Sequence, residues 1–210
     1  MKIALILENS QADKNEVIFN ELNNVAKAHG HTVYNYGMYT SKDDRRLTYV
    51  MNGLLASIVL STKAADFVVT GCGTGEGACL ALNAFPNVTC GHVATPVDSY
   101  LFTQINDGNA ISLPYALGYG WGGEINLRYI FEKLFVNKFG GGYPPERVEA
   151  EQRNKKILDH VKTITHRPLI EILKTLDRDF VKNTINDPKF AELFYPNCQD
   201  QEIADFLKSL

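Results

Sequence analysis

The stretch VVTGCGTGEGACLALN, residues 68–83, has a glycine at every second position from Gly71 to Gly77. A thiol, a hydroxyl and a carboxyl stand between these glycines, at Cys72, Thr74 and Glu76. So much glycine is too loose for the middle of a strand or a helix. We expect a turn that leaves a buried strand and opens a helix, where unpaired backbone N–H groups can hold a phosphate or an enolate oxygen.

Cys72 is the residue of this turn that suits proton transfer or nucleophilic attack. A thiol near the N-terminus of a helix ionises more readily than a free cysteine. The chain contains no CxxC pair, and its five histidines form no ligand pattern with the four cysteines, so we expect no metal and no disulfide framework. Cys79 and Cys90 are predicted to be small core residues.

The arrangement of elements follows from short apolar runs that alternate with amphipathic patterns. Strands are predicted at 3–7, 32–36, 67–70, 88–93 and 110–113, and helices at 14–29, 47–63, 78–83, 95–105 and 124–139. This alternation predicts an α/β, Rossmann-like fold, a doubly wound parallel five-stranded sheet with helices on both faces. Such folds bind ligands at the carboxyl ends of their strands, where the glycine turn is expected.

Beyond FGGGYPPE, residues 139–146, the sequence becomes charged, helical and strandless. We therefore predict a sheet domain over residues 1–145 and a helical C-terminal extension over 146–210. The net charge of -3 comes from interspersed charges, which gives no footprint for nucleic acid or an anionic membrane. The N-terminal MKIALILENS has too short an apolar run for a signal peptide or a membrane span, so a cytoplasmic protein is expected.

Two simpler interpretations of the glycine turn compete with a catalytic one. In the first, the glycines have no role beyond allowing a tight turn from strand to helix. As a dinucleotide fingerprint the turn is weak, because Glu76 replaces the third glycine after Gly71 and Gly73, and because the turn follows the third strand. A nicotinamide-dependent oxidoreductase is therefore a disfavoured alternative.

Three motifs carry a resemblance to a known family. GCGTGEG followed by LALNAFPNV, then QINDGNA, then FGGGYPPERVE resemble, in this order, the signatures of a sugar-phosphate isomerase family. That family includes type B ribose-5-phosphate isomerase and the galactose-6-phosphate isomerase subunits, and the similarity covers about residues 1 to 150. The resemblance implies a cofactor-free homodimer or tetramer, with active sites at the dimer interface, that interconverts aldose and ketose phosphates through an enediolate.

The same resemblance implies roles for individual residues. Cys72 matches the catalytic base, Thr74 a hydroxyl of the anion hole, and Asn106 an asparagine that holds the reacting oxygens. Arg147 matches a phosphate-binding arginine. A proton next to a carbonyl is weakly acidic, so a positioned base and oxyanion donors suit this reaction. Further substrate contacts are expected at Glu8, Asn9, Gly71, Gly73, Gly75, Glu76, Gly77 and Asp107.

The sequence also departs from the family pattern. Glu8-Asn9 replaces the usual Asp-His, Ile105 replaces a ring-opening histidine, and Tyr143 replaces an arginine. The insertion PYALGYGWGGE, residues 114–124, stands where another phosphate-binding arginine is usual. Ring opening and phosphate binding are therefore expected to be rebuilt, with a substrate that needs no ring opening, such as a tetrose 4-phosphate.

Two further residues are candidates to take over lost roles. His92 ends the fourth predicted strand on the ligand side and is a candidate acid/base or substrate contact. Arg45 follows the second strand and is a candidate substrate contact. The leading hypothesis is an aldose-ketose isomerase acting on a small sugar phosphate, a pentose, hexose or tetrose phosphate. The alternative is an inactive module that binds a sugar phosphate or a nucleotide.

Overall fold

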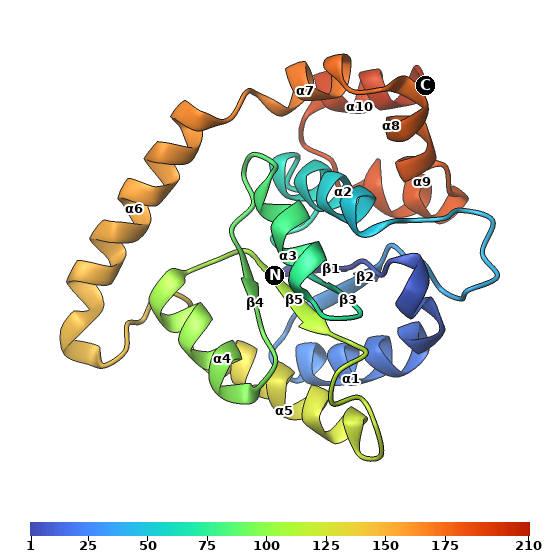
Figure 1. Cartoon of the computed structure of the whole chain (residues 1–210). Coiled ribbons are helices and arrows are strands. Elements are labelled where there is room, and N and C mark those ends of the chain that lie inside the picture. The colour runs from blue at the N-terminus through green and yellow to red at the C-terminus, as the bar shows by residue number, and fades with distance from the viewer.

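Five short parallel strands form the centre of the molecule in a computed structural model that describes all residues from 1 to 210. The strands are β1 (Lys2–Leu5), β2 (Thr32–Asn35), β3 (Phe67–Cys72), β4 (Cys90–His92) and β5 (Ala110–Pro114). Their order in the sheet is β2-β1-β3-β5-β4, and every neighbouring pair is parallel (Figure 1). The predicted doubly wound α/β fold is confirmed.

Helices cover both faces of this sheet (Figure 1). On one face, α1 (Asn15–Ala28) and α5 (Gly123–Phe135) bury apolar side chains against β1, β3 and β5, and α4 (Pro96–Leu101) packs beside α5. On the other face lie α2 (Tyr49–Ser61) and α3 (Glu76–Asn83). Three short helical segments complete the connections: η1 (Asn9–Lys14), η2 (Phe102–Asn106), which continues α4 as a π-helix, and η3 (Pro145–Arg147).

The residues after 145 are helical, as predicted. The long α6 (Val148–Thr165) has no buried residue and stands at the edge of the molecule (Figure 1). The chain then returns through α7 (Leu169–Thr175), α8 (Arg178–Ile185), α9 (Pro188–Phe194) and α10 (Gln201–Lys208), which pack on the outer side of α2. The division of the chain at residue 145 stays a prediction.

Helix α2 shows why this extension is needed. Its residues from Asn52 to Leu60 are all buried, so the helix is apolar on every side. A helix of this kind must be covered on two faces. The sheet and α3 cover one face, and α7 and α8 cover the other. No helix of the chain combines the length and the apolar character needed to cross a bilayer.

The strand order reverses between β1 and β3. From β1 the chain adds β2 on one side, and β3 then pairs with β1 on the other side. The crevice outside the carboxyl ends of two such strands is the usual ligand position in open α/β sheets. The segments that follow β1 and β3, which contain Gln11 and Gly73, meet at this crevice.

Candidate active site

Cys72 is the last residue of β3 and does not lie in the turn that follows. It pairs in register with Pro114, and its carbonyl oxygen accepts a hydrogen bond from Tyr115 N at 2.9 Å. The strand runs two residues beyond its predicted end at 70, because β5 continues the ladder beside it. Gly71 allows this close pairing: a Cβ there would lie 2.2 Å from Leu113 O. The Cys72 thiol is free and nearly buried.

The turn after Cys72 presents backbone N–H groups that have no partner in the chain. Between Gly73 and Ala78, only the N–H of Glu76 donates a hydrogen bond, to Thr74 Oγ1 at 3.3 Å. Gly75 has φ +78° and caps the N-terminus of α3, which begins two residues earlier than predicted. Unpaired amides at a helix N-terminus favour an anion or a developing oxyanion.

Side chains of β4 and β5 contact the backbone carbonyl groups of this turn. His92 Nε2 lies 3.0 Å from Thr74 O, and the buried Ser112 Oγ donates to Gly75 O at 2.6 Å. His92 Nδ1 lies 3.6 Å from a carboxylate oxygen of Glu76. Because a trans peptide points its C=O and N–H in opposite directions, these contacts turn the N–H groups away from β4 and β5. His92 is therefore engaged by the turn itself.

The segment after β1 approaches the same turn. The buried Glu8 carboxylate accepts hydrogen bonds from Ser10 N at 2.9 Å and Ser10 Oγ at 2.5 Å, and so caps η1. Asn9 N donates to Leu47 O at 2.8 Å. A Cβ on Gly73 would lie 3.8 Å from Gln11 Nε2. The ends of β1 and β3 thus meet, as the strand order requires.

Lys14, at the end of η1, is a residue that sequence reasoning missed. Its ammonium donates to Gln11 Oε1 at 2.8 Å and to Tyr115 O, and lies 4.5 Å from the centre of the Tyr119 ring. Burial lowers the pKa of Lys14. No sequence motif marks this lysine, because two of its partners, Tyr115 and Tyr119, lie in the insertion after β5.

Asn106, Asp107 and Arg147 lie at the opposite end of the strands from Cys72, near their amino ends. Asn106 ends η2 four residues before Ala110, which pairs with Val68 near the start of β3. Cys72 stands at the other end of β3, about 13 Å along the strand. Burial raises the pKa of Asp107, and Arg147 ends η3 at the base of α6. One chain does not bring these residues to Cys72.

Arg45 has no free guanidinium to offer a substrate. It is buried, forms an ion pair with Asp187 at 3.1 Å, and donates to Tyr36 O and to Thr184 O. Asp187 and Thr184 belong to the C-terminal extension, which the sequence pattern around residue 45 does not report. We therefore correct the expectation for Arg45: it joins the extension to the sheet domain.

Two further cysteines, Cys79 in α3 and Cys90 in β4, lie close to each other near the turn. Cys90 is buried, whereas Cys79 is half-buried and its Sγ lies 3.5 Å from Cys90 O. A hydrogen bond from the Cys90 thiol lowers the pKa of Cys79 to about 7. Cys79 is thus more exposed than the small core residue expected from the sequence. No three histidine, cysteine, aspartate or glutamate side chains lie close enough to hold a metal ion.

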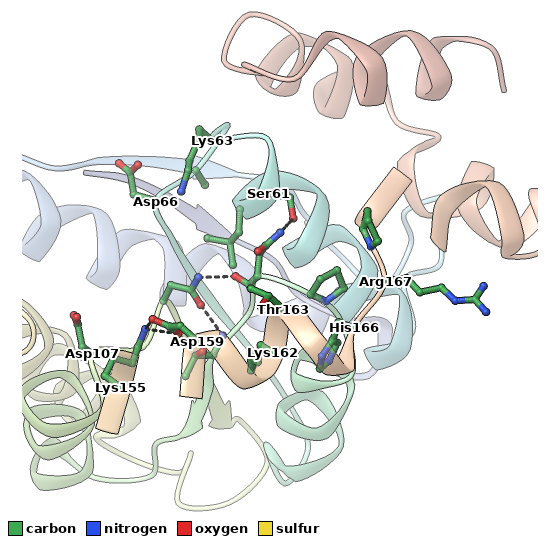
Figure 2. A pocket seen from close by; sticks show the side chains of 17 residues that line it. Ser61, Lys63, Asp66, Asp107, Lys155, Asp159, Lys162, Thr163, His166 and Arg167 are labelled. Carbon is green, nitrogen blue, oxygen red and sulfur yellow. Dashed lines mark hydrogen bonds and ion pairs between the residues drawn. The ribbon is translucent and has the colours of Figure 1, made fainter. Parts of the chain in front are cut away.

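A polar cavity of about 550 Å³ lies away from Cys72, between α6 and the loops at the amino edge of the sheet (Figure 2). Lys155 and Asp159 form an ion pair at 2.6 Å inside it, and Lys162 donates to Val88 O. Figure 2 shows that Arg167, on the link from α6 to α7, points away from these groups. Of the expected site residues, only Asp107 lines this cavity.

Comparison with known proteins adds to this geometry. A family model described as Ribose/Galactose Isomerase matches residues 3–156, and one described as Ribose-5-phosphate isomerase matches residues 164–210. The chain belongs to the ribose/galactose isomerase family. Members of this family are sugar isomerases, so the protein is an enzyme of that class and not a nicotinamide-dependent oxidoreductase. No curated protein matches the chain.

Two solved structures are similar to the ribose/galactose isomerase chain over its whole length. A 4-deoxy-L-threo-5-hexosulose-uronate ketol-isomerase complexed with a tartrate is 58% identical, with a TM-score of 0.98, over 100% of this chain and 98% of that one. A ribose-5-phosphate isomerase from Vibrio parahaemolyticus is 51% identical, with a TM-score of 0.96, over 100% and 98% of the two chains. Both therefore share the C-terminal extension.

A ribose 5-phosphate isomerase from Thermotoga maritima shares the fold alone. It is 21% identical, with a TM-score of 0.59, over 76% of this chain and 97% of that one. The helical extension is thus a feature of the two similar full-length structures and not of this more distant one.

Proposed function

We propose that the protein is an aldose-ketose isomerase that acts on a small, anionic, open-chain sugar, with Cys72 as the acid/base. The observation that carries this proposal is the placement of a free thiol at the crevice between β1 and β3, next to amides that, apart from that of Glu76, are unpaired from Gly73 to Ala78. A base and oxyanion donors are the two components that proton transfer next to a carbonyl requires.

The proposed reaction needs no oxidant or reductant. The Cys72 thiolate takes the proton from C2 of the aldose, and the electron pair forms the C1–C2 double bond of an enediolate. The amides of the turn stabilise the negative oxygen, and Thr74 Oγ1, which accepts from Glu76 N, keeps its own O–H to donate to the substrate. The thiol then returns the proton to C1 while a second proton moves from O2 to O1.

We propose a carboxylate as the anionic end, in a substrate of the 4-deoxy-5-hexosulose uronate class. The relative of that name is 58% identical over the whole chain, and the tartrate in its structure is a small hydroxylated dicarboxylate. A hexosulose with no hydroxyl on C4 or C5 cannot close a five- or six-membered ring onto its C1 aldehyde. Such a substrate, like a tetrose 4-phosphate, needs no ring-opening acid. This fits Ile105, which stands where the family has a ring-opening histidine.

Ribose 5-phosphate is the second candidate substrate. It is favoured by the name of the relative that is 51% identical. Ribose 5-phosphate is mostly cyclic and requires a proton donor and acceptor at its ring oxygen. His92, the histidine nearest the turn, has its nitrogens directed to Thr74 O and Glu76, so the chain offers no evident ring-opening group.

We further propose that two chains share each active site. Asn106 and Arg147 reach a Cys72 crevice only if a second copy supplies them. Helix α6 supports such an assembly, because it buries no residue in the monomer and exposes Ile157, Leu158, Val161 and Ile164. An isologous dimer can cover both α6 helices at once.

The test is a comparison of kcat/KM in deuterated water for 4-deoxy-L-threo-5-hexosulose uronate, ribose 5-phosphate and erythrose 4-phosphate. We expect the uronate to be preferred, with solvent deuterium at C1 of the ketose. A preference for ribose 5-phosphate would replace the proposed substrate and retain the reaction. Absence of exchange with all three sugars would contradict the proposed reaction.

A further inference from the structure

Lys14 lies beside the end of β3 without belonging to the catalytic turn. Its ammonium donates to Tyr115 O, and the N–H of the same Tyr115 donates to Cys72 O at 2.9 Å. Tyr115 is almost fully buried, so its backbone is a fixed point that bonds to both Lys14 and Cys72. The charged end of Lys14 is therefore held at the carboxyl ends of the strands, where Tyr115 links it to Cys72.

The charge of this ammonium has no counter-ion in the chain. No carboxylate lies within ion-pair distance of Lys14, in contrast to Arg45 with Asp187 and Arg128 with Glu21. Its contacts are neutral: an amide oxygen of Gln11, a backbone oxygen and an aromatic ring. Neutral acceptors orient an ammonium and leave its net charge available to an anion.

Two acidic side chains near Lys14 in sequence, Glu8 and Asp13, are engaged elsewhere, and Glu16 forms no ion pair with Lys14. Both oxygens of Glu8 accept from Ser10, and Asp13 accepts from Ser41 N at 2.7 Å. Burial lowers the pKa of Lys14, so an anion beside it would offset that burial by favouring the charged form. The Lys14 ammonium is thus a positive charge without a carboxylate partner in the chain.

From these contacts we propose that Lys14 binds the anionic end of the substrate, a carboxylate, while Cys72 acts at the other end. This assignment rests on the isomerase function proposed above. A carboxylate oxygen takes the place of Gln11 Oε1, because the Gln11 side chain is partly exposed and can move aside. Lys14 then selects substrates with an anionic end over neutral sugars.

Tartrate and its neutral diamide are the probes, measured by calorimetry on the full-length enzyme. Lys14→Gln removes the charge and keeps an N–H donor for Tyr115 O, whereas Lys14→Arg keeps the charge. The control is Lys42→Gln, an exposed lysine on the loop after β2 whose ammonium makes no hydrogen bond or ion pair. Thermal melting verifies that each variant folds.

We expect Lys14→Gln to weaken tartrate binding about 10-fold or more, as for loss of a charge-assisted hydrogen bond. The diamide is expected to bind wild type and Lys14→Gln equally, while Lys14→Arg and Lys42→Gln keep wild-type tartrate affinity. Equal tartrate affinity in wild type and Lys14→Gln would overturn the assignment of Lys14.

The two proposals fail separately. If tartrate binding depends on Lys14 but no uronate is turned over, the anion site stands and the proposed substrate falls. If the uronate is turned over and its KM is the same in wild type and Lys14→Gln, the function stands and the anion site falls. If Lys14→Gln has a lowered melting temperature, Lys14→Met is used instead, and its tartrate affinity is divided by its diamide affinity. Both ligands bind the same folded fraction, so a ratio equal to that of wild type would overturn the assignment.

Discussion

His92 Nε2 lies 3.0 Å from the carbonyl oxygen of Thr74, so the last residue of β4 holds the turn that follows β3. The contact fixes the direction of the Gly75 N–H, which belongs to the same peptide unit as Thr74 O. We propose that His92, a candidate acid/base or substrate contact from the sequence, acts by positioning this turn.

We predict that His92→Leu lowers kcat about 10-fold or more with little change in KM, because a misplaced oxyanion site loses transition-state stabilisation. His92→Gln, whose amide N–H can reach Thr74 O in place of Nε2, is expected to regain most of the loss. Steady-state kinetics of both variants provide the measurement. Equal kcat values in wild type and His92→Leu would show that the contact does not orient the turn.

Gly75 is predicted to tolerate no side chain. Its φ is +78°, and a Cβ would lie 2.8 Å from the His92 ring. We expect Gly75→Ala to cost about 1–3 kcal/mol in the free energy of unfolding and to lower kcat. Gly118→Ala is the matched control, because Gly118 also has a positive φ, +64°, but no atom within 4 Å of the added Cβ. Similar loss of kcat in both variants would mean that backbone conformation alone matters.

The buried pair Arg45–Asp187 is predicted to hold the C-terminal extension on the sheet domain. Removing one partner leaves an unpaired buried charge, so Arg45→Met or Asp187→Asn is expected to lower the free energy of unfolding by about 3–5 kcal/mol. The double variant should lose less than the sum. Denaturant unfolding measures these values, and turnover per folded molecule should stay near wild type. A large rise in KM for a folded Arg45→Met would return Arg45 to the list of substrate contacts.

A mixing experiment tests whether two chains share a site. Cys72→Ala and Asn106→Ala are each expected to lose most of their turnover. In a dimer with shared sites, unfolding and refolding an equal mixture yields hybrids that hold one intact site, which restores about a quarter of wild-type activity. If each site lies within one chain, the mixture stays as inactive as its components.

The sheet could be predicted from the sequence because its signal is local. Apolar runs such as 67–70 alternate with helical patterns, and this alternation alone selects the doubly wound fold. The glycine motif likewise predicted the strand-to-helix turn, which Gly73, Thr74 and Gly75 form between β3 and α3. The end of β3 was predicted two residues early, because glycines hide a strand whose pairing partner lies in β5.

The roles of Lys14, Arg45 and His92 were not predictable for one shared reason. Each is decided by a partner far away in the sequence: Tyr115 O for Lys14, Asp187 for Arg45 and Thr74 O for His92. No spacing rule reports such contacts. Residue type alone suggested Arg45 and His92 as substrate contacts and gave no signal for Lys14, for which we propose anion binding.

The most direct test of Cys72 as the acid/base is the rate of deuterium incorporation from solvent into the ketose, followed by NMR for wild type, Cys72→Ala and Cys72→Ser. Each chain carries Cys79→Ser, so that a second thiol with a pKa of about 7 does not take part. We predict that both Cys72 variants lose about 100-fold or more of the exchange rate, with unchanged melting temperature and tartrate affinity. Exchange in both variants at more than about a tenth of the wild-type rate would contradict the role assigned to Cys72.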